Sequence, residues 1–132
     1  MRALAILAVA VLLAVPAAGP AATPLQPLVA GWEQYFKLDW QSDLRAGQPL
    51  VSGHVLNDWG FPARNVRILV DAVDASGGIV DQRIAWLGST LTPGTRAYFE
   101  VPMPHVPSSA AARAYRVSVF AFDWVQSGGD HR

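Results

Sequence analysis

The sequence predicts an all-β protein, an immunoglobulin-like two-sheet antiparallel β-sandwich that follows an N-terminal signal peptide. Six segments alternate apolar and polar residues at spacings of about ten to fifteen residues, which is typical of such sandwiches. No segment after the leader has a helical hydrophobic period of useful length. A small barrel is the alternative fold.

The first 22 residues have the anatomy of a secretory signal peptide. Arg2 precedes an apolar run from residue 3 to residue 15, which at 13 residues is too short for the ~20 that a spanning helix needs. Small residues after Pro16 predict cleavage near residues 17–21. We therefore expect a periplasmic or secreted protein without membrane insertion after cleavage, the alternative being an anchor through an uncleaved N-terminus.

The remaining chain divides into a linker at 23–32, one sandwich domain at 33–126 and a flexible tail at 127–132. Period-two alternation predicts strands at 35–42, 50–57, 65–73, 79–86, 95–101 and 115–124.

The same alternation assigns side chains to faces of the strands. Trp40 and Trp86 alternate with the other core residues of their strands. In the last strand, one face carries Tyr115, Val117, Val119 and Ala121, and the other carries Phe120, Phe122 and Trp124.

Composition excludes several classes of function. The chain has no cysteine, so neither disulfides nor a lipid-modified N-terminal cysteine are available. Loss of Arg2 with the leader leaves nine basic against ten acidic residues, a net charge of 9 − 10 = −1. A chain with so small a net charge has no basic surface that would bind nucleic acid or an anionic membrane.

No motif predicts catalytic, cofactor-binding or metal-binding residues. His54 is the catalytic suspect of a less favoured hydrolase hypothesis, but it lies on a strand, and His105 and His131 fall in a proline-rich connection and the tail. The aspartates lack the spacing of a calcium loop, and the chain has no nucleophile elbow and no phosphate-binding glycine loop. We expect a protein that is not an enzyme.

The candidate partner-binding loop is Asp58, Trp59 and Phe61, joined by Trp32. Aromatic residues on a loop either recognise a partner or fold back onto the end of the sandwich. Phe61 leads directly into Pro62, so we expect it to plug the sandwich end, whereas Trp59 follows two polar residues and is expected to be exposed.

Four short patterns resemble the FxLYD-type and DUF3426-type bacterial domains: Gly53-x-Val55-x-Asn57, Gly60-x-Pro62-Ala63, Leu91-x-Pro93-Gly94 and Phe99-x-Val101. The resemblance implies a small extracytoplasmic immunoglobulin-like sandwich. We expect a binding or accessory module of the cell envelope, whose partner is an unknown envelope protein or a glycan. The alternative is a carbohydrate-binding module that uses the aromatic loop.

Overall fold

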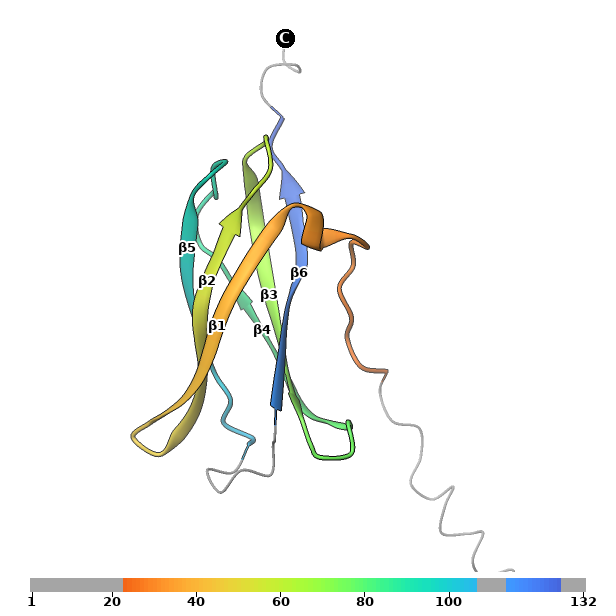
Figure 1. Ribbon diagram of the computed structural model, residues 1–132, viewed down its shortest axis with the longest axis vertical. Coiled ribbons are helices and arrows are strands. Elements are labelled where there is room, and N and C mark those ends of the chain that lie inside the picture. The colour runs from red at the N-terminus through yellow and green to blue at the C-terminus, as the bar shows by residue number, and fades with distance from the viewer. Residues whose placement is uncertain (1–22, 107–113, 127–132) are drawn as a thin grey trace, which may run out of the picture.

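The computed structural model describes residues 23–106 and 114–126, so the expected leader at 1–22 and tail at 127–132 lie outside it. Two antiparallel three-stranded sheets pack face to face (Figure 1), sheet A in the order β1-β2-β5 and sheet B in the order β4-β3-β6. This confirms the predicted all-β sandwich. The elements are η1 (Trp32–Gln34, a 3-10 helix), β1 (Phe36–Arg45), β2 (Gln48–Asn57), β3 (Ala63–Val73), β4 (Ile79–Trp86), β5 (Arg96–Pro102) and β6 (Ala114–Trp124).

The hydrophobic core lies between the two sheets and is built from alternate residues of each strand, as the period-two pattern requires. Its largest fully buried side chains include Phe36, Ile68 and Met103. Sheet A adds Val51, Val55, Phe99 and Val101, and sheet B adds Val66, Val70, Ala72, Val119 and Phe122.

A β-bulge changes the phase of the last strand. Arg67 pairs with Ala121 but the next residue, Ile68, pairs with Val119, which leaves Phe120 between two paired positions. Val119 and Phe122 therefore both belong to the core, although strict alternation assigned them to opposite faces. That assignment is wrong because an extra residue in one strand reverses the face of every residue after it.

The outer face of sheet B is partly apolar, so alternation alone does not distinguish it from the core face. The predicted core position of Trp86 is wrong for this reason. Leu69 points away from the core yet is buried. The residues expected to form a linker run across this face: Leu28 donates its N–H to the carbonyl of Phe120 at 2.8 Å, and the Gln82 amide pairs with Leu25. Trp86, expected in the core, is 62% exposed, and the guanidinium of Arg67 lies 4.6 Å from its ring centroid.

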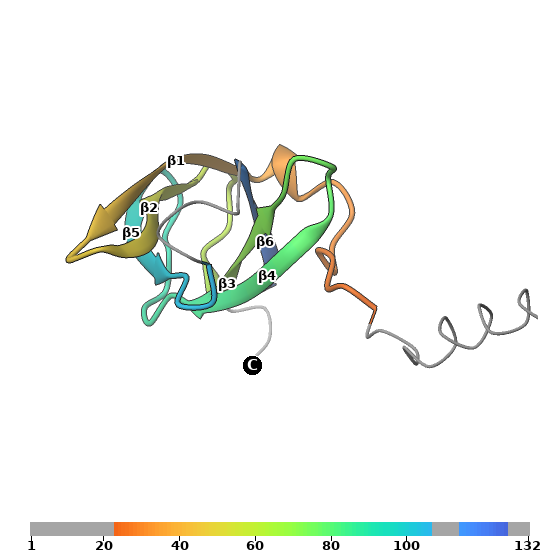
Figure 2. The ribbon, with the colours of Figure 1, turned by 90° about the horizontal axis from the view of Figure 1, so that it is seen from below.

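The β1–β2 hairpin extends beyond the body of the sandwich, and residues 41–48 are all exposed (Figure 2). The backbone of β1 lies against Gly53: a Cβ there would stand 2.0 Å from the carbonyl oxygen of Asp39 and 2.6 Å from Cα of Trp40. Trp40 lies where the strand leaves the core and is 39% exposed, so its expected core position is also wrong.

Among the described residues, the strand order matches part of an immunoglobulin sandwich. Sheet A corresponds to the order A-B-E, and sheet B corresponds to C′-C-F. In the immunoglobulin fold a further strand, G, pairs with F. Within residues 23–106 and 114–126, no strand pairs with β6 on the side away from β3.

Candidate functional site

Four aromatic side chains form a continuous surface at the end of the sandwich where β2 leads into β3. This aromatic end comprises Tyr35, Trp59, Phe61 and Trp124. The ring of Tyr35 meets the edge of Trp59 at a centroid distance of 4.7 Å and that of Trp124 at 5.3 Å. Phe61 lies 6.3 Å from Trp124. Such edge-to-face contacts give each ring a defined orientation.

Asn57 fixes the loop that carries Trp59 and Phe61. Its side chain is fully buried, and its amide nitrogen donates to the carbonyls of Phe61 at 2.8 Å and Leu91 at 2.9 Å. Its amide oxygen accepts the N–H of Trp59 at 2.9 Å. The N–H of Asp58 donates to the carbonyl of Tyr35 at 2.8 Å. The loop is thus held in one conformation, and the exposed carboxylate of Asp58 lies beside Trp59 in the chain.

Both loop aromatics present about half of their surface to solvent. Trp59 is 43% exposed, in keeping with the expectation for that residue. Phe61 is 49% exposed, so it does not plug the sandwich end. The bulge explains why, because it turns Phe122 inward, where this ring packs 4.8 Å from Phe36 and fills that place in the core.

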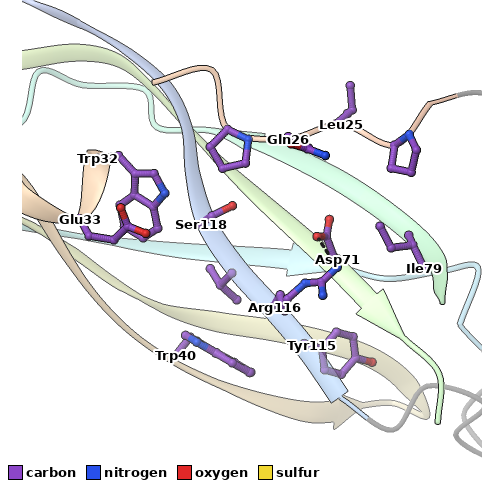
Figure 3. A pocket seen from close by; sticks show the side chains of 13 residues that line it. Leu25, Gln26, Trp32, Glu33, Trp40, Asp71, Ile79, Tyr115, Arg116 and Ser118 are labelled. Carbon is purple, nitrogen blue, oxygen red and sulfur yellow. Dashed lines mark ion pairs between the residues drawn. The ribbon is translucent and has the colours of Figure 1, made fainter. Parts of the chain in front are cut away.

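Trp32 does not join the aromatic end. It lies in η1 and lines a second feature, the β6 groove, together with Trp40, Tyr115, Arg116 and Ser118 (Figure 3). The groove has a volume of about 640 Å³ and is lined chiefly by the N-terminal segment at 24–27, by η1 and by residues 115–118 of β6. Its floor includes Asp71, whose carboxylate lies 3.5 Å from the guanidinium of Arg116 and accepts a 2.8 Å bond from Gln82. Nothing in the sequence pattern indicates this groove, because its position depends on which strands lie at the edges of the sheets.

Burial raises the pKa of Tyr115, and nearby Asp81 raises it further. A tyrosine phenol is already neutral at physiological pH at its ordinary pKa, and this shift moves its ionisation still higher, so the phenol at one end of the groove can donate a hydrogen bond.

His54 lies on the outer face of sheet A, away from both features. Its Nδ1 is 3.5 Å from a carboxylate oxygen of Asp39, and its ring lies 5.4 Å from that of Tyr98. The arrangement resembles the histidine and orienting acid of a catalytic triad, but no hydroxyl among the described residues hydrogen-bonds to the imidazole.

The same face holds a surface ion pair. Arg45 donates two hydrogen bonds to Glu100, at 2.9 and 2.6 Å, and the hydroxyl of Tyr98 donates a third at 2.7 Å. The hydrogen bonds from Arg45 and then from Tyr98 lower the pKa of Glu100 to about 2.

Within residues 23–106 and 114–126, no group of three or more histidine and acidic side chains is placed to bind a metal ion. In the same ranges, no helix has the length and apolar character needed to span a membrane.

No family model and no curated protein matches the chain. The chain is similar to several solved structures. A DUF1425 family member from Shewanella sp. pv-4 is 14% identical, with 64% of this chain and 73% of that chain covered and a TM-score of 0.47. The ApaA protein from Bordetella pertussis is 12% identical, with 77% and 96% covered and a TM-score of 0.37. Likenesses this low in identity and TM-score carry no functional argument.

Proposed function

We propose that the protein is an exported, non-catalytic binding module of the bacterial cell envelope that recognises another envelope protein through its aromatic end. The observation that carries the proposal is the half-exposed pair Trp59 and Phe61 on a loop pinned by buried Asn57. A fixed loop supports binding, because little conformational entropy is lost when a partner docks on it.

Aromatic side chains favour this assignment over a purely structural role. Tryptophan is among the residues most often found at the energetic centre of interfaces. An exposed, contiguous aromatic surface also lowers the solubility of a small domain. A partner that binds this surface would explain why it is exposed.

A glycan is the second candidate ligand. The exposed carboxylate of Asp58 precedes the exposed indole of Trp59, and a ring that stacks on sugar beside a hydrogen-bond acceptor is a common arrangement for carbohydrate recognition. A glycan array separates the two candidates, because stacking on Trp59 should give retention that Trp59→Ser removes.

The binding proposal is tested by affinity capture from envelope extracts. Wild type is compared with a Trp59→Ser/Phe61→Ser variant and with Trp86→Ser, which removes a more exposed tryptophan on the outer face of sheet B. A partner recovered by wild type and Trp86→Ser, but not by the double variant, supports the proposal. Equal recovery by all three proteins contradicts it.

Export is tested separately by intact-mass measurement on envelope fractions. Cleavage near residues 17–21 places the mature N-terminus between Ala18 and Ala22. A mass that retains the first 16 residues would instead support an anchored protein.

A further inference from the structure

We propose that the edge of β6 away from β3 accepts an extended segment of another polypeptide, which adds a fourth strand to sheet B by β-augmentation. The proposal is independent of the aromatic end. Its starting point is the topology, since β6 occupies the place of strand F and no described strand occupies the place of strand G. An unpaired edge presents main-chain N–H and C=O groups that another strand can bind.

The core is open on this side of the sandwich. Leu38 on β1, and Tyr115 and Val117 on β6, point inward and pack on the core but remain only partly buried. On the opposite side of β2, two of the three inward residues of β5, Phe99 and Val101, are buried, and the third, Ala97, is partly buried. β1 and β6 are the end strands on the open side, and Figure 1 shows them flanking the same side of the sandwich. An added strand would cover these side chains.

The protein already places one extended segment of its own on this edge, without completing a strand. Leu28 donates its N–H to the carbonyl of Phe120 at 2.8 Å. Pro24 and Pro27 lack N–H groups, so this segment cannot continue the ladder. Leu25 instead bonds to the side chain of Gln82, at 2.9 and 3.0 Å, on the outer face of the sheet. The edge therefore accepts a main-chain bond, and no strand within residues 23–106 and 114–126 pairs with it.

The lining of the groove defines the segment that would fit. One face of an added strand would meet the partly buried Val117 and Trp40, which favours valine, leucine or isoleucine at alternate positions. The other face would lie beside Arg116, Asp71 and Ser118, which favours threonine, serine or other polar residues. The occupant is therefore an amphipathic β-strand of a partner protein.

The experiment uses a synthetic peptide of about ten residues that alternates valine and threonine between terminal lysines. Its control replaces two central residues by proline, which removes N–H donors. Hydrogen exchange is measured at the amides of residues 115–119. The alternating peptide should slow exchange at the outward amides by about tenfold or more, and the proline peptide should not. Equal effects, or no effect, of the two peptides overturn the proposal.

Two variants locate the site. Val117→Lys puts a charge on the apolar side of the groove and should abolish the peptide effect, whereas Trp86→Lys, on the opposite edge strand β4, should leave it intact. If Val117→Lys does not fold, the two-peptide comparison on the wild type still decides. Chito-oligosaccharide that slows exchange where neither peptide does would make the groove a sugar site and overturn the proposal. A dimer in which β6 pairs with itself, and which the peptide fails to dissociate, would also overturn it.

Discussion

Replacement of Asn57 by alanine should destabilise the protein by about 3 kcal/mol. The side chain makes three hydrogen bonds, to Phe61, Leu91 and Trp59, and is fully buried. Each bond contributes about 0.5–1.5 kcal/mol net, and alanine leaves the Leu91 carbonyl short of a partner on its buried side. Against a total stability of about 5–15 kcal/mol for a domain, this loss is large but leaves the protein folded.

Urea denaturation followed by tryptophan fluorescence measures the loss. With a slope of about 1–2 kcal/mol per molar urea, the midpoint should fall by about 1.5–3 M while the slope is unchanged. Gln41→Ala is the control, because its side chain is exposed and its one bond, to Asp43, is 3.3 Å long. Its free energy of unfolding should stay within about 0.5 kcal/mol of the wild-type value. If both variants have the same midpoint, Asn57 does not hold the loop as described.

Three further predictions follow from particular contacts. Gly53→Ala should destabilise the protein by more than about 2 kcal/mol, because its Cβ would meet the β1 backbone at 2.0 Å. The Cβ of the control Gly88→Ala meets nothing within 4 Å, so this variant should be tolerated. Thermal melts of the two variants test the difference. Phe99→Ala should cost about 3–5 kcal/mol in urea denaturation, and a cost below 1 kcal/mol would show that this ring is not in the core. Because the folded-state pKa of Glu100 is lowered from 4.5 to about 2, any stabilisation from its pair with Arg45 is present above pH 4.5 and is lost as the pH falls toward 2. NMR titration should show this pKa, and Arg45→Gln should return it toward the ordinary value; a wild-type midpoint near 4.5 would contradict the pairing.

The strands could be predicted from the sequence because alternation is a local property of the chain. All six expected strands are present, and the first two are longer than expected, since the polar tip at 41–48 pairs through its backbone rather than through an apolar face. The pattern cannot report where one residue is added between paired positions. The bulge at Phe120 is therefore not predicted, and Phe122 and Trp124 lie on the face opposite to the one that alternation assigns.

The tryptophans show a second limit. An apolar residue is expected to be buried, but the sequence does not show which part of the protein covers it. Leu69 is buried although it points away from the core, so the outer face of sheet B contains apolar residues that alternate as core residues do. Trp86 was assigned to the core for this reason. Trp32 is expected beside Trp59 and Phe61 because all three residues are aromatic. Only the tertiary structure shows that η1 lies apart from the aromatic end.

The role of Asn57 at the candidate site could not be predicted from the sequence. In the structure it is a buried residue whose amide binds three backbone groups. Its partner Leu91 is 34 positions further along the chain, so local sequence carries no sign of that bond.

The central claim, that the aromatic end is the binding surface, is tested most directly by the affinity of Trp59→Ser for the partner that wild type captures. Because about half of the indole is buried against neighbours such as Tyr35, the substitution should cost about 2 kcal/mol of stability and leave a folded protein. Titration calorimetry on this folded variant should show at least a tenfold weaker Kd, about 1.4 kcal/mol, while Trp86→Ser binds as wild type does. A folded Trp59→Ser protein with the wild-type Kd would contradict the account.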